Sequence, residues 1–342
     1  MNILIVDDDP IAVEMLRETL IDDGHRVASA ADGNAGLARL AGEPFHLVIT
    51  DWEMPGCTGP ELCRAVRGGA AGSAGAGYCY LVLLTGHDSR AQRIEGLSAG
   101  ADDFLSKPFD RDELLARLRS AERIVSLETR DVAIFAMAKL AESRDSDTGA
   151  HLERVQGYAR CLTQRLLATG EHAELLDAEY VRLIHSTSPL HDIGKVGIPD
   201  AVLLKPGRLS DKEFDVMKTH TTLGADTLEA AAARFPGAGF LEMARDIAAT
   251  HHERFDGTGY PRGLAGEEIP LCGRIVALAD VYDALTSKRV YKDAFTHDVA
   301  RGILVGDAGT HFDPRVVDAF LAAEEEFVAI SERFAEGRRL AA

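Results

Sequence analysis

The spacing of hydrophobic positions changes along the chain. Short apolar runs at residues 2–6, 46–50 and 81–84 alternate with helix-like segments up to about residue 122, and polar residues follow each run. This alternation predicts a doubly wound α/β domain around a parallel sheet. After Arg144 the chain is a succession of helical patterns broken by Gly and Pro, which predicts an all-α domain. We therefore expect a multidomain protein.

A long helical pattern without Pro or Gly, from Asp110 to about Arg144, joins the two halves. It exceeds the usual length of a globular helix. Two interpretations stay open: a connector that runs from one domain into the next and can pair with a second copy as a two-stranded coil, giving a homodimer, or a helix that packs on its own domain. Its apolar positions are Leu114, Leu118, Ile124, Leu127, Ile134, Phe135 and Leu140.

Composition narrows the class of protein. The 342 residues suffice for about two domains, each with its own core. A net charge of −18 argues against a general binder of DNA, so an anionic substrate must be attracted locally. Five cysteines without paired or zinc-type spacing suggest a reducing cytoplasm. Since no apolar run approaches 18 residues, we expect no membrane insertion.

Carboxylates follow two of the predicted strands. Asp7 and Asp8 come directly after the first apolar run, and Asp51 ends the second. The carboxyl ends of parallel strands meet at the edge where α/β sheets bind ligands. Later runs end at Thr85 and Lys107. A solvated acidic loop is the plain alternative, but these acids end apolar runs and do not sit inside a polar stretch.

This order of acids, hydroxyl and lysine resembles the response-regulator receiver domain, which has a flavodoxin-like fold. The resemblance implies that Asp51 accepts a phosphoryl group from a sensor histidine kinase. It implies a Mg²⁺ site formed by Asp7, Asp8, Asp51 and the backbone carbonyl of Glu53. It implies the switch residues Thr85, Phe104 and Lys107. A receiver fold that no longer accepts phosphate is disfavoured, because every chemical position is filled.

The second half carries a different chemistry. His191-Asp192 is followed by Lys195, by the doublet His251-His252, and by Gly259-Tyr260-Pro261. An imidazole beside a carboxylate suits hard-to-borderline divalent metals. A carboxylate also has two oxygens, so it can bridge two ions about 3.5–4 Å apart, as in two-metal displacement at phosphorus. The pattern predicts a metal-dependent phosphodiesterase centre.

These motifs resemble the HD-GYP family of cyclic di-GMP phosphodiesterases. Besides His191-Asp192 and Gly259-Tyr260-Pro261, further blocks occur in the family's order, beginning at residues 147, 205, 217 and 280. The resemblance implies the metal ligands Asp147, His151, His191, Asp192, His220, His251, His252 and Asp280. Asp147 and His151 are four residues apart, so on a helix they would share a face. Eight donors suit two or three divalent ions, and the absence of thiolates favours iron or manganese over structural zinc.

Further residues receive roles from the same resemblance. Lys195 and Asp192 are the expected catalytic residues: the lysine neutralises a phosphate oxygen or protonates the leaving alkoxide. Arg289 and Lys292 are expected to bind phosphate, although Val290 stands where the family has Pro. Tyr260 is expected to stack on or border a guanine, with packing of a tight turn as its plain alternative.

We therefore expect a cytoplasmic, phosphorylation-regulated phosphodiesterase that opens cyclic di-GMP to linear pGpG, GMP or both. Residues 1–122 form the predicted receiver domain, 110–144 the connecting helix and 131–342 the HD-GYP domain. Two alternatives remain: an HD hydrolase of another cyclic dinucleotide or nucleotide, and a non-catalytic module that binds the messenger or a partner protein. All eight ligand positions hold residues able to bind metal, which argues against the second.

Overall fold

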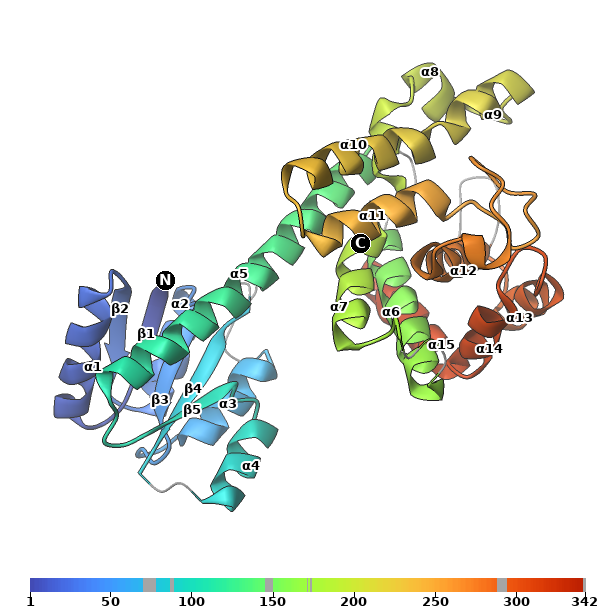
Figure 1. The fold of residues 1–342 in the computed structure, drawn as a ribbon. Coiled ribbons are helices and arrows are strands. Elements are labelled where there is room, and N and C mark those ends of the chain that lie inside the picture. The colour runs from blue at the N-terminus through green and yellow to red at the C-terminus, as the bar shows by residue number, and fades with distance from the viewer. Residues whose placement is uncertain are drawn as a thin grey trace. The chain divides into compact units, whose positions relative to one another are not determined.

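The computed structural model describes residues 1–69, 78–86, 89–144, 150–170, 172, 174–287 and 294–340. The chain forms two compact units, Met1–Val132 and Ala133–Ala342 (Figure 1). The boundary falls inside one long helix, α5 (Arg111–Glu142). The predicted helix across this region is therefore present. Within the described residues, no helix is both long and apolar enough to cross a membrane.

The first unit is an α/β domain with a five-stranded sheet of order β2-β1-β3-β4-β5, in which every pair is parallel. Its strands are β1 (Asn2–Val6), β2 (Arg26–Ala30), β3 (Leu47–Asp51), β4 (Tyr80–Thr85) and β5 (Asp103–Ser106). Its other helices are α1 (Pro10–Asp22), α2 (Gly33–Gly42), α3 (Gly59–Arg67) and α4 (Arg90–Ser98). The predicted doubly wound fold is confirmed.

Alternation along the strands explains why helices cover both faces of this sheet. Successive side chains of a strand point to opposite faces. Ile3 and Ile5 pack in one cluster with Leu16 of α1 and Leu114 of α5. Leu4 and Val6 pack in another cluster, which includes Leu40 of α2 and Leu62 of α3. The strands are apolar on both faces because both are buried.

The second unit is helical in its described residues, which confirms the predicted all-α domain. Its elements are α6 (His151–Thr169), α7 (Ala178–Thr187), the 3₁₀ helix η1 (Ser188–Gly197), α8 (Asp200–Leu203), α9 (Asp211–Lys218), α10 (His220–Arg234), α11 (Gly239–Thr250), the 3₁₀ helix η2 (Gly266–Glu268), α12 (Leu271–Thr286), α13 (His297–Gly306), α14 (Pro314–Leu321) and α15 (Glu324–Leu340).

The second half of α5 belongs to the core of this helical unit. Ile134 and Ala138 are buried in a cluster with Leu152 of α6 and Leu190 of η1. Those two leucines are the sequence neighbours of His151 and His191. The helix thus contributes its beginning to the core of the first unit and its end to the core of the second.

Candidate metal centre and phosphorylation site

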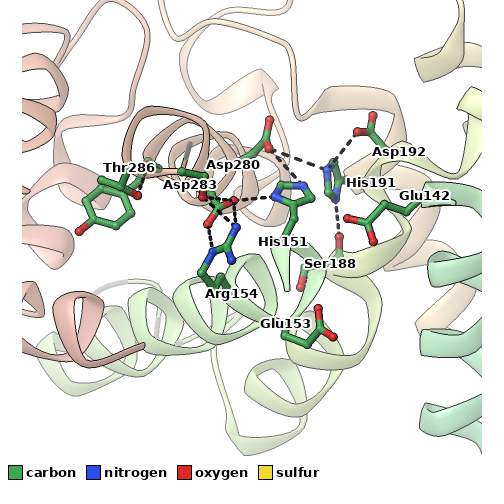
Figure 2. A network of polar contacts seen from close by, with 12 residues as sticks. Glu142, His151, Glu153, Arg154, Ser188, His191, Asp192, Asp280, Asp283 and Thr286 are labelled. Atoms are coloured by element: carbon green, nitrogen blue, oxygen red, sulfur yellow. Dashed lines mark hydrogen bonds and ion pairs between the residues drawn. The ribbon is translucent and has the colours of Figure 1, made fainter. Parts of the chain in front are cut away.

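Four of the five predicted histidine ligands lie at the ends of helices. His151 and His220 are the first residues of α6 and α10, and His251 and His252 follow the last residue of α11. His191 and Asp192 lie in η1, and Asp280 lies in α12. Figure 2 shows the side chains of His151, His191, Asp192 and Asp280 converging from three elements. Helix ends present neighbouring side chains in divergent directions, so one short segment reaches more than one ligand position.

Gly194 explains how η1 brings Asp192 to His220. A Cβ atom at Gly194 would lie 1.9 Å from the carbonyl oxygen of His220 and 2.5 Å from the backbone nitrogen of Gly224. No other residue fits there without moving backbone, because real Cβ atoms do not approach this closely. The glycine of the His-Asp-Ile-Gly-Lys motif therefore allows η1 to lie directly on the start of α10.

Asp192 lies between two groups of potential ligands. Its Oδ2 atom is 3.4 Å from His191 Nε2, while Oδ1 is 3.3 Å from His220 Nε2 and 3.7 Å from His251 Nε2. One group consists of Asp192, His220, His251 and His252. The other consists of His151, His191 and Asp280. In each group, one ligand atom per residue lies within 4.8 Å of the others. The two oxygens of Asp192 thus face different groups.

These residues fit a divalent metal centre. His191 Nε2 and Asp192 Oδ1 are buried and make no hydrogen bond, a costly arrangement unless a ligand completes it. Two ligands bound to one ion at about 2.0–2.2 Å lie roughly 3–3.5 Å apart, and the measured separations of 3.3–3.7 Å around Asp192 are close to this range. The donor set holds nitrogen and oxygen only, which suits a divalent metal ion.

The pKa shifts of the side chains agree with this fit. Burial lowers the pKa of His220 to about 4, and burial beside His251 lowers the pKa of His252 well below its usual range. Both imidazoles are therefore neutral, as metal ligands must be. Burial would lower the pKa of His191, but Asp192 and Asp280 raise it to about 9. His191 thus holds a proton between carboxylates, where a divalent cation would replace it.

Hydrogen bonds fix the orientation of four imidazoles. In each ring, Nδ1 faces a hydrogen-bond acceptor and Nε2 faces the ligand group, an arrangement that fixes the tautomer of metal-binding histidines. The pairs are His151 with the Asp283 carboxylate at 2.8 Å, His191 with the Ser188 carbonyl at 2.9 Å, His220 with the Met217 carbonyl at 2.7 Å and His251 with the Ile247 carbonyl at 3.0 Å.

Asp283 and Arg154 support the centre and were missed in the sequence analysis. Arg154 donates to Asp283 through Nε at 2.5 Å and through Nη2 at 2.9 Å (Figure 2). The same Nη2 atom donates to Ser287 at 2.8 Å. Asp283 follows Asp280 by three residues, so both carboxylates lie on one face of α12. This spacing was the available signal, although it does not reveal the partner His151.

Lys195 and Tyr260 lie beside the centre. Lys195 Nζ is 2.8 Å from Asp192 Oδ2. Burial opposes ionisation of Asp192, yet Lys195 and His191 hold the pKa of its carboxyl well below the usual range. The ring of Tyr260 lies 4.8 Å from the ring of His252 at an angle of 32°. Three predicted residues, Asp147, Arg289 and Lys292, lie outside the described residues.

Gly259 sets the position of Tyr260. A Cβ atom at Gly259 would lie 2.3 Å from the backbone nitrogen of Arg254, so only glycine allows this loop to cross the segment after His252. The buried carboxylate of Glu253 accepts hydrogen bonds from the backbone of Arg262 at 2.8 Å and of Leu264 at 3.1 Å. These contacts hold the Gly-Tyr-Pro loop over the histidine doublet.

The acidic residues of the first unit also come together. Asp7, Asp8 and Asp51 offer ligand atoms within 4.8 Å of one another. Lys107 Nζ lies 2.7 Å from Asp7 and 2.9 Å from Asp51. Burial raises the pKa of Asp51, and Lys107 opposes that shift. An oxygen-only cluster suits a hard cation such as Mg²⁺.

The other predicted residues of this site lie near it in the chain or the sheet. Thr85 is buried at the end of β4, and β4 pairs with both β3 and β5. Phe104 lies in β5, which ends one residue before Lys107. Glu53 follows Asp51 by two residues. The sheet order therefore brings the carboxyl ends of β1, β3 and β4 to one edge, as expected from the sequence.

Comparison with known families assigns both units. Residues 136–316 match the HD domain, and residues 3–119 match the response regulator receiver domain. The chain belongs to the HD domain family. The predicted combination of a receiver domain and an HD domain is confirmed. An HD domain implies a divalent metal centre, and the two ligand groups around Asp192 lie within its matched residues.

Relatives of this HD domain protein include enzymes that act on cyclic dinucleotides. A cyclic di-GMP phosphodiesterase of Vibrio cholerae is 54% identical over 223 residues, which cover 65% of this chain and 45% of that protein. The cyclic di-GMP phosphodiesterase response regulator RpfG of Xanthomonas campestris is 38% identical over 98% of this chain and 90% of its own length. A 3'3'-cGAMP-specific phosphodiesterase of Vibrio cholerae is 41% identical over 59% of this chain and 36% of that protein.

Proposed function

We propose that this chain is a phosphorylation-regulated phosphodiesterase that hydrolyses cyclic di-GMP to linear pGpG, GMP or both. The observation that carries the proposal is the position of Asp192, whose two oxygens face separate ligand groups and whose neighbour Lys195 supplies a cation. The relatives named above support the substrate class, and RpfG supports the combination with a receiver domain.

In this proposal, side chains of the HD domain divide the work. His151, His191 and Asp280 would hold one ion, His220, His251 and His252 would hold a second, and Asp192 would contribute an oxygen to each group. When bound, such ions supply Lewis acidity and align the reacting oxygens at phosphorus. Lys195 neutralises a phosphate oxygen or protonates the leaving alkoxide. Arg289 and Lys292, proposed from the sequence, bind phosphate.

The finer cofactor assignments are part of the proposal. We assign iron or manganese to the HD domain because its donors are imidazoles and carboxylates. A third ion depends on Asp147, which the sequence resemblance alone supports. We assign Mg²⁺ to Asp7, Asp8, Asp51 and the backbone carbonyl of Glu53 in the receiver domain.

The receiver domain acts as the input in this proposal. A sensor histidine kinase supplies the phosphoryl group to Asp51, and Thr85, Phe104 and Lys107 respond to it. We retain domain boundaries at residues 1–122, 110–144 and 131–342, with α5 common to both domains. Ile124 and Leu127 of α5 are each more than a third exposed, which supports pairing of this helix with a second copy.

A direct assay tests the proposal. The purified full-length chain, loaded with iron or manganese under anaerobic conditions, is incubated with cyclic di-GMP, 3'3'-cGAMP and cyclic di-AMP, and the products are separated by chromatography. We expect cyclic di-GMP to be hydrolysed fastest. Protein that carries at least two ions and hydrolyses none of the three would contradict the proposal.

A second candidate keeps the chemistry and changes the substrate. The 41% identity to a 3'3'-cGAMP-specific enzyme favours a hydrolase of another cyclic dinucleotide. The same assay separates the two candidates, since faster turnover of 3'3'-cGAMP than of cyclic di-GMP would select this one.

A further inference from the structure

An exposed aromatic pair lies beside the candidate metal centre. The ring of Phe214, in α9, lies 6.1 Å from the ring of Tyr260 at an angle of 80°. Tyr260 in turn lies 4.8 Å from the imidazole of His252. Phe214 is 47% exposed, a large fraction for an apolar side chain. One ring, that of Tyr260, separates it from the predicted metal ligand His252.

A lysine lies over both rings. Lys218 Nζ is 5.4 Å from the centre of the Phe214 ring and 6.0 Å from that of Tyr260, within the range of cation–π contacts. Its other partner is the carboxylate of Asp215 at 2.7 Å. Lys218 is two residues before His220 in the chain. The aromatic pair therefore has a positively charged hydrogen-bond donor next to it.

Core packing does not account for Phe214. No residue of α9 is buried, and Phe214 belongs to none of the hydrophobic clusters formed by the described residues. The helix is nevertheless well fixed at its start. Ser210 and Glu213 form a capping box, and Lys205 holds the Glu213 carboxylate at 2.6 Å. A short, anchored helix thus presents an aromatic ring to solvent next to the centre.

We propose that Phe214, Tyr260 and Lys218 form a subsite for a purine base, and that Lys218 favours guanine over adenine. This inference rests on the proposed function. In a nucleotide, only a ribose separates the phosphate from its base, so a base has to lie close to the ligands that hold the phosphate. Aromatic rings stack on bases of any sequence. Lysine donates to O6 and N7 of guanine, whereas adenine presents an amino donor in place of O6.

The test uses a substrate without a base. Bis(p-nitrophenyl) phosphate reports hydrolysis at the metal centre, and GMP and AMP serve as competitive inhibitors of that reaction. For the wild-type protein we expect GMP to bind more tightly than AMP. In Phe214→Ala the inhibition constants of both nucleotides, and the KM for cyclic di-GMP, should rise about 5- to 100-fold, because stacking on one base is lost. The kcat for bis(p-nitrophenyl) phosphate should not change, because the variant leaves the metal ligands in place.

Two further variants separate stacking from charge. Phe214→Trp keeps an aromatic face and should retain tight GMP binding. Lys218→Met should weaken GMP about 5-fold or more and leave AMP almost unchanged, so that the preference for guanine disappears. The matched controls are Phe235→Ala, at a 60% exposed phenylalanine after α10, and Lys212→Met, at an exposed lysine of α9. Both should behave as the wild type.

The possible failures are distinguishable. If the wild-type protein hydrolyses bis(p-nitrophenyl) phosphate and no cyclic dinucleotide, the proposed function is wrong. If cyclic di-GMP is hydrolysed but Phe214→Ala leaves both inhibition constants unchanged, the subsite is wrong. Equal binding of GMP and AMP by the wild type, or an equal loss of both in Lys218→Met, would overturn the role of Lys218 in base selection. Circular dichroism and metal content verify that each variant is folded and loaded.

Discussion

The two candidate metal sites of this chain differ in their donors and in what already compensates their charge. The receiver site consists of carboxylates, and Lys107 contacts both Asp7 and Asp51 within 3 Å. The HD site mixes imidazoles with carboxylates, and it leaves His191 Nε2 and Asp192 Oδ1 buried without a hydrogen bond. Lys107 compensates part of the charge of the first site, whereas the second site keeps buried polar atoms that no hydrogen bond satisfies.

This difference indicates different uses of metal. An oxygen-only site suits a hard cation, and its lysine already pairs with two of the carboxylates. A buried site with orphaned donors suits ions that stay bound, since removing them leaves polar atoms unsatisfied. The hydrogen bonds of the imidazoles support this difference. Four imidazoles of the HD site have Nδ1 next to a hydrogen-bond acceptor, which is a backbone carbonyl in three cases.

The largest effect is expected from Asp192→Ala. Among the described residues it removes the one carboxylate that faces both ligand groups, so hydrolysis should fall by far more than the about 10- to 100-fold typical for losing an outer partner of a metal ligand. Bound metal, measured by elemental analysis, should also decrease, while the helical circular dichroism spectrum is kept. Asp226→Ala, at an exposed position of α10, is the control. Wild-type turnover with less metal would disprove the assignment.

The next effect concerns the outer contacts of the HD site. Asp283→Asn keeps the shape of the side chain but removes the charge that orients His151 and pairs with Arg154. Metal affinity should fall about 10- to 100-fold, as for other outer partners of metal ligands. Competition with a chelator measures this directly. An unchanged affinity would show that the backbone alone orients His151.

The residues of both sites could be predicted from the sequence because each motif lies within a short stretch of the chain. Asp7 and Asp51 end apolar strand patterns, and parallel strands bring their ends to one edge. The HD motif places His191 and Asp192 side by side in the chain. Each of these patterns spans only a few residues. The class of each domain and most of its candidate ligands could therefore be predicted from the sequence.

Contacts between segments that are distant in the chain could not be predicted from the sequence. The partner of His151 is Asp283, 132 positions later, and nothing in the local pattern pairs them. From the sequence alone, Gly194 looks like a glycine that only interrupts a helix. Its close contact with the backbone at the start of α10 is visible only in the structure. An apolar residue such as Phe214 is expected in the core of an amphipathic helix, but it is half exposed beside Tyr260. These features depend on tertiary packing and not on local pattern.

A smaller effect should separate two ions from three. Asp147 lies outside the described residues, so the expectation rests on the sequence. If it is a ligand, Asp147→Ala should lower the metal content by about one ion and slow the second cleavage more than the first, since a further ion would help to hold the terminal phosphate of the linear product. Elemental analysis and a time course of pGpG and GMP measure both. An unchanged metal content would remove Asp147 from the ligand set.

The smallest expected effect is the change in phosphodiesterase activity when the receiver site is phosphorylated. Charge added at Asp51 changes the balance that Lys107 now maintains, and α5 begins four residues after that lysine. Farther along α5, Ile134 and Ala138 pack with Leu190, the neighbour of His191, so a shift of α5 bears on the ligands of the HD site. Beryllofluoride, a phosphoryl mimic, should therefore change the phosphodiesterase rate or the dimer affinity about 5-fold, or about 1 kcal/mol. Asp51→Asn should abolish this response and leave the metal content of the HD site unchanged. If beryllofluoride binds, as fluorescence of Trp52 beside Asp51 would report, and both rate and self-association stay constant, then the receiver does not control this enzyme.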